Sequence, residues 1–479
     1  MPSAPLLGTV FFVNELVRKS SLTRSLRIPL TNIYAKGGYC AHVKLGEHQH
    51  PVNLVLDTGS STLVVHNGSY QPHEDTALKP TPYEQDVCYG MGGWYGPVVN
   101  TRVSFHGLGL SIHLDDVHVA VTAKEESQSF AQADGILGLA YDGLNTAYDL
   151  TSFLQTREVS PEVTYPYTLN QTDASVRDYR KWLHDFPKQT LTPYFTQLEA
   201  QGVVANQFAL LTHRSSIFQT NSHCPIRKLQ ASKANHGLLV LGKPHIHADL
   251  YKAPIHTAKV LHDKYYNVNV KAVQIDGQPK RSAPALKDSE VKGYCTNGIV
   301  DSGASMVMFP PSLYKQLMND FANHNPQFTN LLAPFMTFDG TEKGIDANKV
   351  NLHEWPNIYL YIEGENTEAD NNSNDDIEGK HKGHNKGRDI RLCIPPEHYW
   401  QIHAPEPEMV SFKILSTPNW PNQSILGLPL LNNYYTIFDR ENGDKGVIQF
   451  ATKTSLSDAL HLESSGIFHS QTKQNKNKE

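Results

Sequence analysis

The chain contains the same acidic turn twice, each time between two apolar runs. Residues 52–65 have the sequence Val-Asn-Leu-Val-Leu-Asp-Thr-Gly-Ser-Ser-Thr-Leu-Val-Val, with the acidic residue at Asp57. Residues 299–309 have the sequence Ile-Val-Asp-Ser-Gly-Ala-Ser-Met-Val-Met-Phe, with the acidic residue at Asp301. The flanks predict buried strands, and a lone buried carboxylate is costly unless it is paired or strongly hydrogen-bonded. The repeat therefore predicts two similar lobes that each bring one carboxylate to a shared site.

A second motif accompanies each acidic turn. Residues 133–140 have the sequence Ala-Asp-Gly-Ile-Leu-Gly-Leu-Ala, and residues 424–428 have the sequence Ser-Ile-Leu-Gly-Leu. Glycine in such a segment allows another backbone to approach closely. The acidic turn and the Ile-Leu-Gly segment, present together in both halves, resemble the paired active-site elbows of the pepsin-like aspartic peptidase family. In that family an apolar-apolar-glycine segment passes beneath the catalytic elbow of each lobe.

The resemblance implies an all-β, bilobal pepsin-like fold with a central cleft and a flap hairpin. It covers roughly residues 27–454, apart from two insertions and one low-complexity loop that it leaves unmatched. The expected organisation begins with an N-terminal extension (1–26). An N-terminal lobe (27–248) carries the first catalytic Asp and the flap, with insertions at about 141–190 and 213–236. A C-terminal lobe (249–454) carries the second catalytic Asp, with a disordered loop at about 363–389, and a polar tail (455–479) follows.

Two facing carboxylates that share one proton can hydrolyse a peptide bond without a metal or an organic cofactor. The ionised carboxylate takes a proton from a bound water, and the protonated carboxyl donates to the scissile carbonyl. By resemblance, Asp57 and Asp301 form this catalytic dyad, which titrates as a unit. No cofactor and no metal are expected.

Four further elbow residues are expected to hold this geometry. By resemblance, Thr58 and Ser302 cross-link the elbows through reciprocal hydroxyl–backbone hydrogen bonds. Gly59 and Gly303 allow the backbone amides to face the carboxylates. The Ser for Thr difference between the two elbows keeps the hydroxyl that this cross-link needs.

The elbows differ at the residue three positions after each Asp. By resemblance, Ser60 donates to the outer oxygen of Asp57, whereas Ala304 has no hydroxyl to donate to Asp301. A carboxyl that loses a donor to its charged form has a higher pKa. We therefore expect an activity optimum that is less acidic than that of a digestive pepsin.

Residues 87–96, Val-Cys-Tyr-Gly-Met-Gly-Gly-Trp-Tyr-Gly, predict the tip of a β-hairpin, because glycine supplies the positive φ of tight turns. In the pepsin family a Tyr-Gly-x-Gly hairpin is the flap that closes over the substrate, which assigns Tyr89 and Gly90 to the flap. The family usually has Thr or Ser in place of Met91 and Trp in place of Val64. The orientation of Tyr89 is therefore left open.

The side chains expected to line apolar pockets beside the dyad are Val55, Ile299, Tyr89 and Ile136. Cleavage between large hydrophobic residues of an extended peptide or unfolded protein is the expected specificity. Phe130 is the one aromatic residue shortly before the 133–140 motif, which favours smaller apolar side chains in the main pocket.

Composition limits the partners of the chain. Its 479 residues carry a formal net charge of −6 without a stripe of Lys or Arg, so no nucleic-acid partner is expected. No apolar run approaches the roughly eighteen residues of a membrane span. The five cysteines are scattered without Cys-x-x-Cys spacing, which favours reduced thiols in a reducing compartment over a disulfide scaffold or a zinc site.

The N-terminal segment points to the same compartment. Residues 4–13 are apolar but make a poor signal peptide and are more typical of a strand. The 56 residues before Asp57 leave too little length for the propeptide usual in the family. A monomeric, cytoplasmic enzyme is expected, with secretion as the alternative, and the narrower resemblance is to the bacterial pepsin homologues called shewasins.

Three functions compete for this chain. The first is a pepstatin-sensitive aspartic endopeptidase that uses the dyad. The second is a non-catalytic peptide- or protein-binding protein on the same fold, since a fold alone does not determine function. The third, a glycosidase with paired carboxylates, would not explain the repeated elbow and Ile-Leu-Gly segments.

Overall fold

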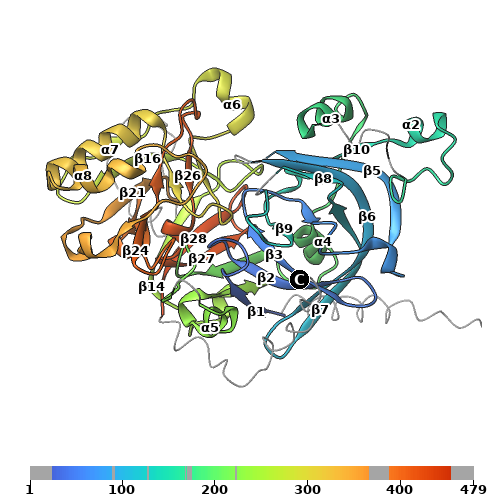
Figure 1. The fold of residues 1–479 in the computed structure, drawn as a ribbon, viewed down its shortest axis with the longest axis horizontal. Helices are drawn as coiled ribbons and strands as arrows, with labels where there is room; N and C mark the ends of the chain where they lie inside the picture. Colours follow the sequence, from blue (N-terminus) through green and yellow to red (C-terminus); the bar gives the residue numbers. More distant parts are fainter. Residues whose placement is uncertain are drawn as a thin grey trace, which may run out of the picture.

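The computed structural model describes residues 24–88, 92–126, 129–167, 169, 175–221, 224–365 and 388–454. Figure 1 shows two β-rich halves, with the first part of the chain in blue to green and the second in yellow to red. Within the described residues the strands form four sheets, and short helices lie at their edges.

The largest sheet has 16 strands and extends through both halves. In chain order these strands are β1 (Leu26–Thr31), β2 (Cys40–Leu45), β3 (His50–Asp57), β4 (Leu63–Val65), β5 (Lys79–Cys88), β6 (Gly93–His106), β7 (Ser111–Val121), β8 (Lys124–Glu125), β9 (Gly135–Gly138), β10 (Thr146–Asp149), β11 (Lys188–Thr190), β12 (Gln207–Leu211), β13 (His236–Leu241), β14 (Tyr251–Lys259), β27 (Tyr434–Asp439) and β28 (Val447–Lys453). Their order in space is β11-β10-β5-β6-β7-β4-β9-β3-β2-β1-β13-β12-β27-β28-β14, with β8 paired to β6.

Three smaller sheets belong to the second half. The first has the order β15-β18-β26-β19-β25, the second β17-β16-β21-β22 and the third β20-β24-β23. Their strands are β15 (Asn267–Val268), β16 (Val270–Ile275), β17 (Arg281–Ser282), β18 (Gly298–Val300), β19 (Val307–Met308), β20 (Ile345–Asp346), β21 (Ile358–Ile362), β22 (Ile390–Ile394), β23 (Trp400–Ile402), β24 (Met409–Phe412), β25 (Ile414–Leu415) and β26 (Ser424–Leu426).

The helices are short, apart from one in the second half. The α-helices are α2 (Thr151–Thr156), α3 (Val176–Leu183), α4 (Tyr194–Ala200), α5 (Ile226–Ala231), α6 (Asp288–Tyr294), α7 (Pro311–His324), α8 (Phe328–Leu332), α10 (Pro396–Tyr399) and α11 (Leu428–Leu431). Single 3₁₀ turns occur at Pro72–Glu74, Asp142–Leu144, Lys233–Asn235, Pro244–Ile246, Ala333–Phe335, Ala347–Lys349 and Leu352–Glu354.

The longest helix shows how the sequence determines local structure. Pro311 lies in the first turn of α7, where its missing N–H costs nothing. Leu313, Leu317 and Phe321 recur every fourth position and are buried, so one apolar stripe faces the core. The helix ends at His324, where Asn325 takes an extended conformation.

The end of the chain returns to the first half. β27 pairs with β12, with Leu210 opposite Thr436, and β28 then pairs with both β27 and β14. The main apolar core includes Leu56 from the first half and Val300 and Phe438 from the second. The predicted fold class, a β-rich bilobal pepsin-like fold, is confirmed.

Several predicted segments lie outside the described residues. They are most of the N-terminal extension, including the strand expected at 4–13, the flap residues Tyr89 and Gly90, most of the loop at 363–389 and the tail from 455. In the part of the chain that the structure describes, no helix has the length and apolar character to cross a membrane.

Candidate active site

The first elbow connects two strands of the large sheet. β3 ends at Asp57, and β4 resumes at Leu63. β9 lies between them, parallel to β3 with Val55 opposite Ile136, and antiparallel to β4. The segment that follows β9 holds the turn, because the backbone N–H of Leu139 donates to the carbonyl of Asp57 at 2.7 Å.

The second elbow repeats this arrangement in another sheet. β18 leads to Asp301 and β19 leaves the turn. β26 lies between them, parallel to β18 with Ile299 opposite Ile425, and antiparallel to β19. The predicted equivalence of the two acidic turns therefore extends to the strands that carry them.

The glycines of the two Ile-Leu-Gly segments lie directly against the elbows. A Cβ atom on Gly138 would fall 2.5 Å from the Cα atom of Ser61, a distance that real side chains do not reach. A Cβ atom on Gly427 would overlap the carbonyl oxygens of Ala304 and Met306. The prediction that glycine permits a close backbone approach at these positions is confirmed.

Reciprocal hydrogen bonds join the tips of the two elbows. The Thr58 hydroxyl donates to the Val300 carbonyl at 2.9 Å and accepts from the Ser302 N–H at 2.9 Å. The Ser302 hydroxyl donates to the Leu56 carbonyl at 2.8 Å and accepts from the Thr58 N–H at 3.1 Å. Thr58 and Ser302 are buried. The four bonds fix the separation of the two carboxylates.

Each carboxylate accepts a hydrogen bond from its own turn. The Gly59 N–H donates to Asp57 and the Gly303 N–H donates to Asp301, both at 2.8 Å. The glycines also leave room for the opposite carboxyl, since a Cβ atom on Gly59 would lie 2.8 Å from the carboxyl carbon of Asp301. Gly303 is exposed and Gly59 half-buried, so the elbow tips are accessible from solvent.

The two carboxyl groups are electrostatically different. The Ser60 hydroxyl donates to Asp57 at 2.5 Å, and Ala304 offers Asp301 only its backbone amide. Burial, then the charge of Asp57 and a hydrogen bond between the two carboxyls, hold the pKa of Asp301 well above its ordinary value. A carboxyl pair of this kind retains one proton where an isolated Asp is ionised.

The family model described as "Eukaryotic aspartyl protease" matches residues 38–177 and 194–452. The chain belongs to this family. Its relatives include a beta-secretase of Strongylocentrotus purpuratus, 21% identical over 90% of this chain and 70% of that protein. Plasmepsin IV of Plasmodium falciparum is 22% identical over 84% of this chain and 67% of that protein. Vacuolar protease A of Neurospora crassa is 26% identical over 37% of this chain and 52% of that protein.

The predicted pocket residues of this aspartyl protease lie close to the dyad. Val55 and Ile299 lie on β3 and β18, two positions before Asp57 and Asp301, and Ile136 is paired with Val55. All three are only 5–6% exposed. Phe130 packs in the same apolar cluster as Val55 and Ile136, so an aromatic ring contributes to this wall of the site.

Val64, which stands where the family usually has Trp, is fully buried in β4. It packs with Trp94 of β6 in the cluster that contains Val55 and Ile136. The apolar wall of this aspartyl protease thus has an indole ring, contributed by the hairpin strand instead of the elbow strand. Tyr89 and Gly90 lie between β5 and β6, outside the described residues, and their place in the site stays a prediction.

Tyr265, for which no role was predicted, lies near the dyad. Burial, followed by the negative charges of Asp301 and Asp57, raises the pKa of the Tyr265 hydroxyl to about 12. The neighbouring Tyr266 accepts a hydrogen bond from the Val300 N–H through its carbonyl, which places this segment beside the second elbow. The paired aromatic residues before β15 were the sequence signal that could have identified it.

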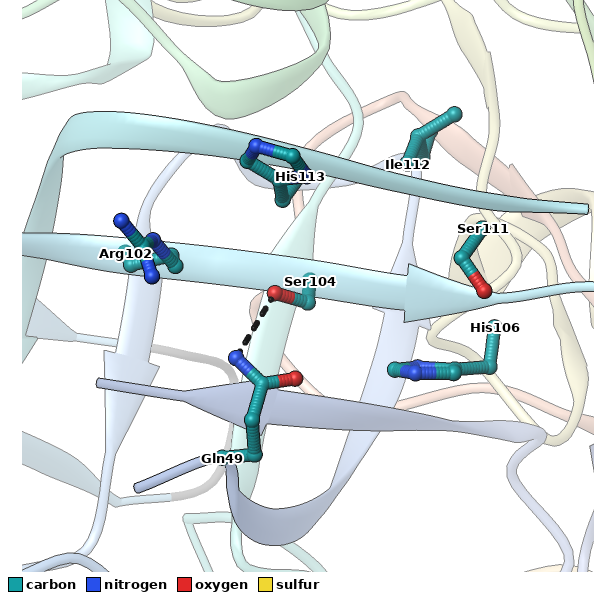
Figure 2. Close-up of a pocket in the computed structure, with 7 residues that line it drawn as sticks. All are labelled: Gln49, Arg102, Ser104, His106, Ser111, Ile112 and His113. Atoms are coloured by element: carbon teal, nitrogen blue, oxygen red, sulfur yellow. Dashed lines mark hydrogen bonds between the residues drawn. The ribbon is translucent and has the colours of Figure 1, made fainter. Parts of the chain in front are cut away.

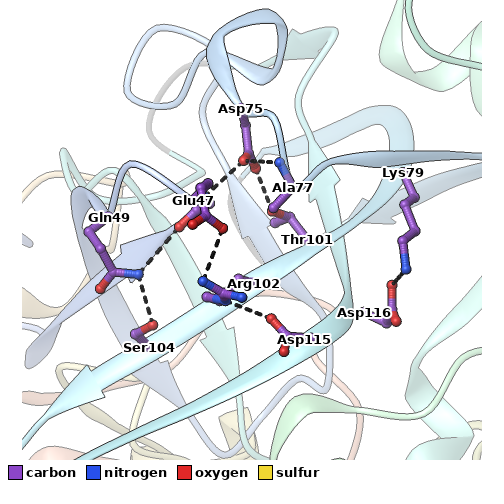
Figure 3. A network of polar contacts seen from close by, with 11 residues as sticks. Glu47, Gln49, Asp75, Ala77, Lys79, Thr101, Arg102, Ser104, Asp115 and Asp116 are labelled. Atoms are coloured by element: carbon purple, nitrogen blue, oxygen red, sulfur yellow. Dashed lines mark hydrogen bonds and ion pairs between the residues drawn. The ribbon is translucent and has the colours of Figure 1, made fainter.

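A separate hollow of about 140 Å³ lies on β6, β7 and the turn before β3, away from the residues that surround the dyad (Figure 2). Its one guanidinium belongs to Arg102. Glu47 at 3.0 Å and Asp115 at 2.6 Å neutralise that charge, as Figure 3 shows. Gln49 extends across the hollow to the hydroxyl of Ser104. The two carboxylates offset the charge of Arg102, and none of the residues that line the hollow is among those that surround the dyad.

Proposed function

We propose that this chain is an aspartic endopeptidase that hydrolyses peptide bonds between hydrophobic residues through Asp57 and Asp301. The observation that carries the proposal is the pair of facing carboxyls, held together by the four reciprocal hydrogen bonds between the two elbows. Membership of the aspartyl protease family supports the peptidase class of activity.

The proposed reaction follows from the asymmetry of the pair. Asp57 accepts hydrogen bonds from the Gly59 amide and the Ser60 hydroxyl, and these bonds stabilise the ionised carboxylate. It removes a proton from a bound water as the water attacks the scissile carbonyl carbon. Asp301 donates its proton to the carbonyl oxygen, which gives a tetrahedral diol. The proton then held by Asp57 passes to the amide nitrogen as the C–N bond breaks, and Asp301 takes back a proton from one diol hydroxyl as the product carboxyl forms.

Apolar walls on both sides of the dyad support a preference for hydrophobic residues flanking the cleaved bond. Val55, Ile136 and Phe130 form one wall, and Ile299 lies at the corresponding position of the other lobe. A buried apolar surface binds side chains without demanding a specific hydrogen-bond partner. An extended peptide is the expected substrate form, because a folded chain does not present a free scissile bond to two fixed carboxyls.

The test is cleavage of a fluorogenic hydrophobic peptide between about pH 3 and about pH 7, with and without pepstatin. Asp57→Asn and Asp301→Asn should each reduce kcat by at least about a thousandfold, within the range that acid–base groups supply. Asp288→Asn is the matched control, because Asp288 is exposed on α6. Retained activity in either dyad variant, or an inactive but folded wild-type protein, would overturn the proposal, and the second result would favour a binding protein.

The finer assignments stay predictions. They are the likeness to bacterial homologues, the cytoplasmic location, the monomeric state and the absence of nucleic-acid and membrane partners. The relatives named above are eukaryotic. All five cysteines are unpaired, and Cys40 is buried with its pKa raised by burial, which supports a reducing compartment. Titration of five thiols in the purified, denatured protein would support that location, and fewer would contradict it.

A further inference from the structure

The insertion after the first Ile-Leu-Gly segment adds strands to the hairpin β5–β6. β10 pairs with β5, placing Tyr148 opposite Glu84, and β11 pairs with the other edge of β10. Thr164, further along, donates through its hydroxyl to the carbonyl of Tyr83 at 2.8 Å. Figure 1 shows α3 and β10 beside β5. The outer edge of β5 is therefore occupied, whereas a two-stranded hairpin alone is only marginally stable.

α3 lies across this hairpin and contacts both strands. The ring of Tyr179 stacks on Tyr95 of β6, with centroids 3.7 Å apart and planes 12° from parallel. Its hydroxyl is hydrogen-bonded to Glu84 of β5, which is 2% exposed. The interface is a separate apolar cluster whose buried members are Tyr95, Tyr148, Leu150, Leu154, Leu169, Val176, Tyr179 and Leu183.

Two basic side chains of this segment approach a buried carboxylate of the hairpin. The Asp86 side chain on β5 is 3% exposed, and the Arg180 Nε lies 3.0 Å from its carboxylate. The His184 Nε2 lies 3.2 Å from the other oxygen of that carboxylate. Removing Arg180 leaves this buried carboxylate with weaker charge compensation. Arg180 therefore helps to hold β5 at Asp86.

The base of the insertion is tied to the catalytic elbow. The side-chain carbonyl of Asn145 accepts from Gln85 of β5 at 2.9 Å and from the Thr62 hydroxyl at 3.0 Å. The Asn145 side-chain NH₂ donates to the carbonyl of Leu191, at the other end of the insertion, at 3.0 Å. Thr62 in turn accepts, through its carbonyl, the N–H of Gly138 beneath the elbow. One buried amide thus connects both ends of the insertion, the hairpin and the elbow.

The hairpin also packs on the wall of the site. Trp94 and Val98 of β6 belong to the apolar cluster that contains Val55 and Ile136, with Val87 of β5 packed against it. A displacement of β5 and β6 therefore displaces this wall. Much of the contacting face of α3 lies in residues 178–193, which the family match leaves out.

We propose that the insertion at 142–191 positions the hairpin β5–β6 against the substrate pocket, with Arg180 and Tyr179 as positioning residues for peptide cleavage; this inference rests on the proposed function. These residues act through Asp86 and Glu84 and touch neither the carboxyl dyad nor the pocket wall. Loss of the contacts weakens substrate binding, because the hairpin then samples positions that do not complete the pocket. The chemical step is retained, because the reciprocal bonds between the elbows are independent of α3.

The experiment compares variants of the full chain on the same fluorogenic peptide. Arg180→Ala should raise KM roughly tenfold and leave kcat within about twofold, as expected for loss of an ion pair to a buried carboxylate that positions the hairpin but takes no part in the chemical step. Arg180→Lys should restore part of the binding. Tyr179→Phe keeps the stacked ring and should raise KM by about threefold. Lys181→Ala is the matched control, because Lys181 is exposed on the same helix and pairs only with Asp178.

Backbone hydrogen exchange provides a readout that does not depend on activity. The amides of residues 83–88 should exchange roughly tenfold faster in Arg180→Ala than in Lys181→Ala, because β5 opens more often. Equal exchange in these two variants, together with equal KM values, would overturn the proposed positioning role. If the wild-type protein cleaves no peptide, the proposed function fails, and the exchange rates still decide whether α3 holds the hairpin.

Discussion

The elbow at Asp57 and the elbow at Asp301 have the same backbone plan and different surroundings. In each, a central strand lies between the two strands that carry the elbow, and this strand has the sequence Ile-Leu followed by glycine. Each elbow also contributes a hydroxyl to the reciprocal bonds. Only the first has a side-chain hydroxyl on its carboxylate. Only the first is connected, through Asn145, to a hairpin that carries a packed insertion. The shared parts fix the separation of the carboxyls, and the unshared parts determine which carboxyl holds the proton and how the hairpin is supported.

The backbone arrangement that the two elbows share can be disrupted at the glycine of either Ile-Leu-Gly segment. Gly427→Ala and Gly138→Ala should each destabilise the protein by more than about 4 kcal/mol, because the new methyl group meets backbone atoms that cannot move aside. Soluble yield and the free energy of unfolding measure the effect. Gly293→Ala on α6 is the control, since a Cβ atom there has open space. A glycine variant as stable as this control would show that the close approach is not required.

The shared plan was also the part that the sequence could predict. Each elbow and each Ile-Leu-Gly segment is a short, continuous stretch of sequence that occurs in both halves. Each contains glycine at a position where the backbone has no room for a side chain. Helix α7 was predictable for the same reason, since its apolar spacing is local. The fold class followed from these motifs together with the resemblance that they carry.

The unshared parts could not be predicted, because they depend on contacts between distant segments. Glu84 and Asp86 alternate with Gln85 along β5 and have the polar character of surface positions. They are buried only because α3, almost a hundred residues later, covers them. Tyr265 was missed because its nearness to the dyad depends on the backbone hydrogen bond between Val300 and Tyr266, which joins segments that are distant in the sequence.

Glu84 of the hairpin, which α3 covers, should make the stability of the folded protein depend on pH. Burial raises the pKa of Glu84 from 4.5 to about 8, only partly offset by the hydrogen bond from Tyr179. The folded protein therefore retains a proton that the unfolded chain releases above its ordinary pKa. The stability that the protonated Glu84 carboxyl contributes is fully present below about pH 4.5 and is lost as the pH rises through about 8.

Glu84→Gln should remove this dependence while keeping the shape of the side chain. Between about pH 5 and about pH 8 the wild-type free energy of unfolding should fall, relative to the variant, by on the order of a few kcal/mol. Other groups facing Glu84 are Tyr95 of β6 and Tyr148 of β10, with the paired Asp86 and Arg180 nearby, and both proteins retain them. Denaturant titrations at several pH values make the measurement, with the exposed Glu74→Gln as control. Parallel pH profiles would contradict the buried, protonated state.

The smallest expected effect tests the one-hydroxyl difference between the elbows. In the proposed mechanism the dyad is active with one proton, and loss of that proton from the pair produces the alkaline limb of the activity profile. In Ala304→Ser a hydroxyl placed like that of Ser60 donates to the ionised carboxylate and lowers the pKa of Asp301. A hydrogen bond to a charged group contributes roughly 1.5 kcal/mol, so the alkaline limb of kcat/KM should move to lower pH by about one unit.

The converse variant shows whether this shift belongs to the elbow and not to a general change in the site. Ser60→Ala removes the hydroxyl that donates to Asp57, so the dyad loses a donor to its charged form and the acidic limb should move to higher pH. The alkaline limb should move less. If Ala304→Ser leaves the alkaline limb in place, burial and the charge of Asp57 alone set the pKa of Asp301. If the two limbs move independently, the two halves of the chain have separated the roles of base and acid by a single hydroxyl group.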